Sequence, residues 1–146
     1  MKILMENRIF RRLAGGFLIW LVPFIASIPF YGSNGVLLID QMLFKSIMIV
    51  TGSITAAAVM VWYFGIVRTS YTSDAILTGV LWLFENWALD IIVLVGLLGM
   101  ASLTYVNGIG VRYLMIPAIV IAAGMIADGA MKKDREKNSG ENSGLP

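Results

Sequence analysis

Four long apolar stretches separated by short polar segments make up most of the chain. The stretches cover about residues 10–30, 43–67, 75–100 and 111–130. Each is long enough to cross a bilayer, because a transmembrane helix needs about 20 predominantly apolar residues. Short connections make consecutive helices antiparallel neighbours. The pattern therefore predicts an all-α integral membrane protein with four transmembrane helices in an antiparallel bundle.

A polar segment follows the last apolar stretch. Residues 132–146 combine charges of both signs with Ser, Gly and Asn and contain few apolar side chains. Such a composition is typical of disorder, because it cannot bury enough apolar surface. We therefore expect a transmembrane domain over residues 1–131 and a disordered polar cytoplasmic tail over residues 132–146. Near the second stretch, Asp40 is expected to cap a helix at the membrane interface.

The composition of the chain excludes several classes of protein. Of 146 residues, 58% are hydrophobic and 14% are charged, and the mean hydropathy is +0.82. These values exclude a soluble enzyme and a disordered chain. The absence of Cys and His excludes disulfides, thiolate chemistry and histidine proton relays. No serine has a partner base in a known catalytic motif, so we expect no enzymatic activity, no resident metal and no cofactor.

The basic residues indicate the orientation of the helices. The net charge of +2 does not point to nucleic acid, because the basic residues flank the apolar stretches. Four crossings would place nine of the eleven Lys and Arg on the side of the two termini: Lys2, Arg8, Arg11, Arg12, Arg68, Lys132, Lys133, Arg135 and Lys137. The positive-inside rule then predicts that both termini are cytoplasmic. Minimal loops and the lack of a transit peptide favour the plasma membrane of a prokaryote.

Polar side chains interrupt the third apolar stretch at helical spacing. Glu85, Asn86 and Asp90 fall on one arc together with Trp82. A short acidic side chain cannot reach the headgroups from the bilayer interior, and facing lipid would cost on the order of 3 kcal/mol each. We therefore expect these side chains to face protein or water.

Two basic residues lie on the side of the membrane opposite the termini. Lys45 begins the second stretch and shares a helical face with Ser53, and Arg112 begins the fourth. Each could extend its side chain to the outer headgroups without any further role. Each could instead point inward, toward the acids of the third stretch.

Two interpretations of these charges remain open. In the structural interpretation, Asp90 forms an ion pair with Arg112 or Lys45 and fixes the third helix against a neighbouring helix. The net stabilisation by such a buried ion pair can be near zero. In the functional one, the charges line an outward-facing cavity whose floor is Glu85 and Asn86, with Trp82 below as a steric gate. A carboxylate in such a place could exchange protons with a substrate.

The four-helix plan with one glutamate inside the membrane resembles the small multidrug-resistance transporters in architecture. In that family the essential glutamate lies in the first helix. Here the first stretch contains no acid, and Glu85 is in the third. Small fluoride channels also have four helices, but their dual topology conflicts with the charge bias of this chain.

The sequence supports two hypotheses about function. The first is a homo-oligomeric transporter or channel for a small ion or solute, which would use the intramembrane carboxylates. The second is a non-catalytic accessory or scaffold protein that binds a partner protein or lipid, with the charges only joining the helices. Membrane lipids are expected to surround the protein in either case, and its basic tail would lie near anionic headgroups.

Overall fold

Helices form nearly all of the computed structural model, which describes residues 2–65 and 70–142, with side chains for residues 8–65 and 70–139. In chain order the elements are α1 (Lys2–Ser27), η1 (Ile28–Phe30), α2 (Gln41–Phe64), α3 (Tyr71–Asp90), η2 (Ile91–Leu97), α4 (Ser102–Gly108), η3 (Gly110–Leu114) and α5 (Met115–Asn142). Four helical segments in these residues are long and apolar enough to cross a membrane: Arg8–Phe30, Gln41–Phe64, Tyr71–Leu97 and Gly110–Ser139. The predicted all-α class and the four spans are confirmed.

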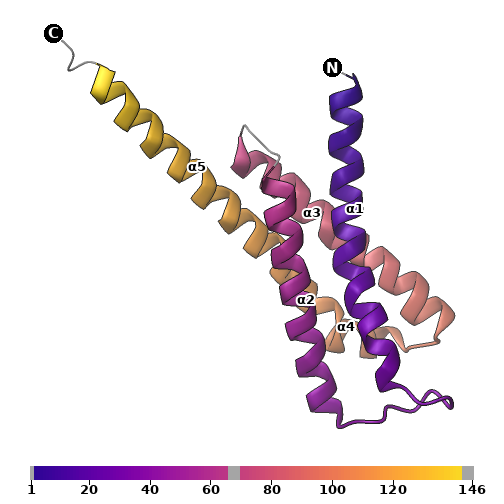
Figure 1. Cartoon of the computed structure of the whole chain (residues 1–146). Coiled ribbons are helices and arrows are strands. Elements are labelled where there is room, and N and C mark those ends of the chain that lie inside the picture. The colour runs from indigo at the N-terminus through magenta and orange to yellow at the C-terminus, as the bar shows by residue number, and fades with distance from the viewer. Residues whose placement is uncertain (1, 66–69, 143–146) are drawn as a thin grey trace.

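The central element of the bundle is α3. It packs against α5 along one side and against α1 along another, while α2 packs mainly against α1. The beginning of α1 and the end of α5 lie at the same end of the molecule, and α5 diverges from the other helices toward that end (Figure 1). We call the end with the termini the inner end and the opposite one the outer end.

All four long helices contribute to the buried core. Its members are Ile19 from α1, Val59 and Tyr63 from α2, Ala75 and Trp82 from α3, and Val120 from α5. Glycines bring α3 and α5 close together, since a Cβ atom added to Gly79 would lie 2.9 Å from Pro117 Cα. Small residues of this kind allow the close backbone approach that membrane helices use for packing.

The start of α2 follows the expectation from the sequence. The Asp40 carboxylate accepts hydrogen bonds from the amides of Met42 at 2.9 Å and Leu43 at 3.0 Å. These bonds satisfy two of the amides that a helix leaves unpaired in its first turn. The expected role of Asp40 as a helix cap is therefore confirmed.

Three elements differ from the pattern read in the sequence. The connection after the third span contains the short helix α4, and α3 continues as the π-helix η2 over Ile91–Leu97. The last helix runs on to Asn142, through residues expected to be a disordered tail. Alternating Lys, Asp, Arg and Glu are good partners for one another at helical spacing, which supports this extension. The loop that contains Arg68 lies outside the described residues.

Candidate functional site

Asp90 is almost completely buried at the end of α3, with 3% of its surface exposed. Its Oδ1 accepts a hydrogen bond of 2.7 Å from the indole Nε1 of Trp20 on α1. Within the described residues, its Oδ2 is buried and has no hydrogen-bond partner. The carboxylate thus has one short hydrogen bond, and its second oxygen depends on the contacts of two nearby tyrosines.

Two tyrosines lie near the Asp90 carboxylate from the chain segment after the π-helix. Tyr105 is on α4 and Tyr113 on η3, and both hydroxyls lie close enough to Asp90 to interact with its charge. Burial and the nearby Asp90 carboxylate raise the pKa of the Tyr105 hydroxyl above its ordinary value. Tyr105 therefore keeps its proton, and its hydroxyl can donate to the Asp90 carboxylate.

Two further acceptors precede Asp90 on the same side of α3. Asn86 is fully buried, and its Nδ2 donates to the Trp82 carbonyl at 2.8 Å and to the Gly16 carbonyl at 3.3 Å. Its Oδ1 has no donor, and neither has the buried Oε2 of Glu85, again within the residues described. The Glu85 carboxylate lies directly over Gly16 of α1, where a side chain would collide with it.

We call these three residues, Glu85, Asn86 and Asp90, the acceptor column. Each has a buried oxygen that could accept a hydrogen bond or hold a cation. Within the described residues, Glu85 Oε2 and Asn86 Oδ1 have no donor, whereas the hydroxyls of Tyr105 and Tyr113 lie beside Asp90 and interact with its carboxylate. Glu85 lies near the middle of the span Tyr71–Leu97. The column thus extends from the middle of the membrane toward the outer end of the molecule.

Trp82 closes the inner end of the acceptor column. Its side chain is fully buried, its Nε1 donates to the Arg12 carbonyl at 2.7 Å, and its ring lies edge-on to Tyr63. Gly15 of α1 makes room for it, because a Cβ atom there would lie 2.8 Å from the indole. Trp82 therefore fills the space between α1 and α3.

The other residues predicted for the site form no hydrogen bond or ion pair with the column in the described part of the chain. Ser53 is exposed on α2, and its hydroxyl donates to the Ile49 carbonyl of its own helix at 2.8 Å. Lys45 and Arg112 are partly exposed, and neither forms an ion pair with an acid among the described residues. The expected pairing of Asp90 with Arg112 or Lys45 is therefore wrong for this structure, because α1 brings Trp20 to the carboxylate instead.

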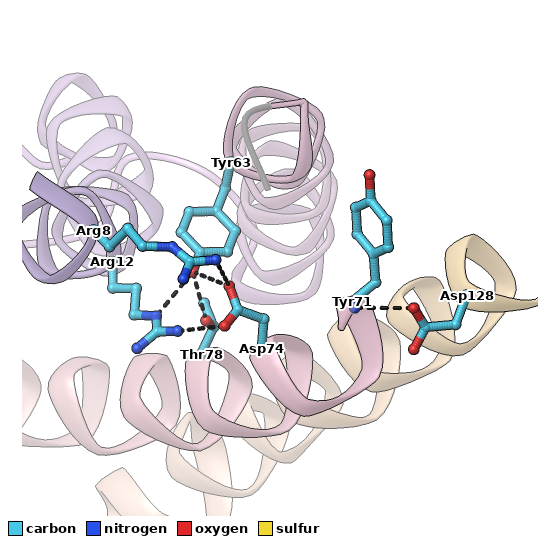
Figure 2. A network of polar contacts seen from close by, with 7 residues as sticks. All are labelled: Arg8, Arg12, Tyr63, Tyr71, Asp74, Thr78 and Asp128. Carbon is cyan, nitrogen blue, oxygen red and sulfur yellow. Dashed lines mark hydrogen bonds and ion pairs between the residues drawn. The ribbon is translucent and has the colours of Figure 1, made fainter. Parts of the chain in front are cut away.

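A second polar cluster at the inner end joins three helices. Asp74 of α3 accepts from Arg12 Nη2 at 2.8 Å through Oδ1 and from the Tyr63 hydroxyl at 3.2 Å through Oδ2. Arg12 Nε also donates to the Tyr63 hydroxyl at 2.8 Å, and the Thr78 hydroxyl donates to it at 3.2 Å. Figure 2 shows Arg12, Tyr63 and Thr78 converging on Asp74, with Arg8 at the rim. We call this cluster the inner network.

The first turn of α3 is held by a residue from α5. Ser70 adopts a left-handed conformation with φ of 53° and gives α3 no side-chain cap. Asp128 instead accepts from the amide of Tyr71 at 3.0 Å (Figure 2). It also accepts from the amide of Thr72 at 2.8 Å. A carboxylate is favoured there by the unpaired amides and by the helix dipole.

Sequence reasoning missed the inner network and the partners of Asp90. The charge pattern relates Arg12 to membrane topology alone, and the predicted third stretch begins one residue after Asp74. The Gly15-Gly16 pair was a usable signal, because adjacent glycines in a membrane span favour close contact with another helix. No local pattern relates Trp20 to Asp90, since the two are 70 residues apart.

Similarity to known proteins does not identify the chemistry of this site. Comparison of the chain with protein-family models, with curated proteins and with solved structures finds no match. In the part of the chain that the structure describes, no three acidic side chains gather in the manner of a metal site. The acceptor column suits a proton, a small cation or a donor-bearing solute, because all of these complement unpaired acceptor oxygens.

Proposed function

We propose that this membrane protein is a homo-oligomeric transporter or channel for protons or another small cationic species, which binds along the acceptor column. The observation that carries the proposal is a row of buried acceptor oxygens on one side of α3: Glu85 Oε2 and Asn86 Oδ1 have no donor among the described residues, and the buried Asp90 carboxylate follows them. Unpaired polar groups inside a membrane are costly, and such residues commonly mark ion or proton pathways.

The proposed pathway requires α1 to move relative to α3. Trp82 blocks the inner end of the column by packing against Gly15, and Glu85 is pressed against Gly16. Separation of the two helices at these glycines would release the indole and connect the column to the inner side. A small rocking movement of this kind is how many transporters expose a central site to each side in turn.

The exposure of Glu85 supports the proposed homo-oligomer. One carboxylate oxygen is buried, but the residue as a whole is only partly covered within a single copy of the chain. Its position near the middle of the span would bring the remaining surface into contact with lipid, at a cost of about 3 kcal/mol. A second copy covering this surface would remove that contact and could form the other wall of the pathway.

The proposed orientation places both termini in the cytoplasm of a prokaryotic cell, with the protein in its plasma membrane. It is supported by the excess of Lys and Arg beside the inner ends of the helices, as the positive-inside rule requires. In this orientation the inner network faces the cytoplasm and Asp90 lies in the outer half of the membrane.

The test is flux into proteoliposomes under an imposed pH gradient and membrane potential. We expect the wild-type protein to carry protons or a monovalent cation, and Glu85→Gln and Asp90→Asn to lose that flux while remaining folded. Asp134→Asn is the matched control, because Asp134 is an exposed acid on α5 outside the column. Its flux should equal that of the wild type.

Two results would overturn the proposal. The first is a folded wild-type protein that carries neither protons nor cations under either gradient. The second is full flux in both column variants. Either result would favour the alternative, an accessory protein whose charges join its helices, and crosslinking to partner proteins would then be the next experiment.

A further inference from the structure

A polar pocket lies at the inner end of the molecule, between the beginning of α3 and the end of the span formed by α5. Its volume is about 420 Å³. Residues of two elements line it: Ser70, Ser73, Asp128, Met131, Lys132 and Arg135. None of these residues belongs to the acceptor column or to the inner network.

The charges around the pocket favour an anion. Lys132 and Arg135 are three residues apart on α5, so both side chains reach the same side of the helix. Neither forms an ion pair with an acid in the described part of the chain. The one acid of the lining, Asp128, has both oxygens engaged by the amides of Tyr71 and Thr72. Lys132 lies close enough to Asp128 to interact with its charge, so Lys132, Arg135 and Asp128 together leave the pocket one net positive charge.

The depth of the pocket corresponds to the level of the lipid headgroups. Lys132 follows the first residue of α5, Met115, by 17 positions. At about 1.5 Å per residue this distance is about 26 Å, close to the thickness of about 30 Å of the bilayer hydrocarbon. Lys132 and Arg135 thus lie where α5 leaves the hydrocarbon, and Met131 adds an apolar contact on the membrane side of them.

We infer that this pocket binds the phosphate group of an anionic phospholipid from the adjoining leaflet. Lys132 and Arg135 pair with the phosphate oxygens, and the hydroxyls of Ser70 and Ser73 are placed to donate hydrogen bonds to them. Met131 contacts the beginning of the lipid chains. Because the same phosphate chemistry could come from a free ion, the test must separate the two sources.

The experiment measures the midpoint of thermal unfolding of the full-length protein in detergent. Added phosphatidylglycerol should raise the midpoint, because a ligand that binds the folded state stabilises it, whereas phosphatidylcholine should not. The double variant Lys132→Gln/Arg135→Gln should lose this rise. The matched control is Lys133→Gln/Lys137→Gln, which removes the same charge from the same helix at residues that do not line the pocket. It should keep the full rise.

Three outcomes would contradict the inference. If both double variants lost the rise in midpoint equally, the lipid would be attracted by the overall charge of α5 and not bound at a specific site. A rise produced equally by inorganic phosphate would identify a free anion as the ligand. No rise with phosphatidylglycerol in the wild type would mean that no such lipid binds. As a further check, Ser73→Ala should weaken the rise, and Glu85→Gln should leave it intact, because this site does not depend on the proposed transport.

Discussion

Asp74 and Asp90 lie on the same helix, at opposite ends, and their surroundings differ in one respect. Both oxygens of Asp74 are matched by donors from Arg12 and Tyr63, which come from two other helices. Asp90 has one short hydrogen bond, from Trp20, and its other contacts are with the hydroxyls of Tyr105 and Tyr113; within the described residues no basic side chain pairs with it. A carboxylate with donors on both oxygens holds neighbouring helices together. A carboxylate with an incompletely bonded oxygen can still accept a hydrogen bond from a ligand or bind a cation. The contrast suits a stabilising role for the inner end and the binding role proposed above for the acceptor column.

The largest effect is expected from Asp74→Ala. It leaves Arg12, whose side chain is 12% exposed, without its carboxylate. Loss of one partner of such a buried pair should lower the free energy of unfolding by about 3 kcal/mol. Arg8→Ala is the control, because Arg8 is 46% exposed and its contact of 3.4 Å is long. Exposed pairs contribute about 0.5 kcal/mol or less. Equal losses in denaturant unfolding would refute the assignment of stability to this network.

A slightly smaller effect is expected where α5 crosses the first turns of α3. The added methyl group in Gly124→Ala would collide with the Ala75 side chain and lie 2.9 Å from the Tyr71 carbonyl oxygen. Overpacking of this kind typically costs about 1–3 kcal/mol. In Gly129→Ala, on the same helix, the methyl group meets nothing within 4 Å. That variant should be neutral or more stable, because Ala favours the helix over Gly. Similar unfolding of the two variants would contradict close packing at the inner end.

Asp128→Ala should have a modest effect on stability. It leaves the amides of Tyr71 and Thr72 without their acceptor, and water at the membrane surface can replace it in part. We expect the midpoint of thermal unfolding to fall by a few degrees. Asp134→Ala, at an exposed acid one and a half turns along α5, should leave the midpoint unchanged. A fall of the same size in both variants would point to the charge of α5 and not to the cap.

The smallest effect on stability is expected at the acceptor column. Asp90→Asn retains Oδ1 as an acceptor for Trp20, so the free energy of unfolding should change by less than about 1 kcal/mol. The flux proposed for the protein should nevertheless disappear. Asp74→Asn should have the opposite effect on stability: it removes the charge that pairs with Arg12, so the free energy of unfolding should fall strongly. Strong destabilisation by Asp90→Asn would show that Asp90 serves the fold, as the structural interpretation of the sequence held.

The four spans were predictable because the hydrophobic pattern alone decides which segments can enter a bilayer. The cap at Asp40 was predictable for a similar reason, since it depends on amides two and three residues along the chain. The polar stripe on the third span also followed from helical spacing. In each case the interactions that determine the feature are local to one helix.

The contacts between helices could not be predicted in the same way. Helical spacing places Asp90 on a polar face of α3, but it does not say which helix covers that face. The sequence favoured a basic partner for the charge, whereas an indole from α1 takes that place because α1 lies between α2 and the polar side of α3. The extension of α5 to Asn142 was not predicted because a charge-rich composition occurs both in disordered tails and in exposed helices.

The cap on α3 also has a consequence for the order in which the protein is made. During synthesis the first turn of α3 leaves the ribosome well before Asp128, which follows Thr72 by 56 residues. Until the last helix arrives, Tyr71 and Thr72 have only water for their amides, and Ser70 offers no substitute. Assembly of the inner end is therefore completed only by the last helix to be synthesised. In a nascent chain without that helix, the first turn of α3 lacks the Asp128 cap.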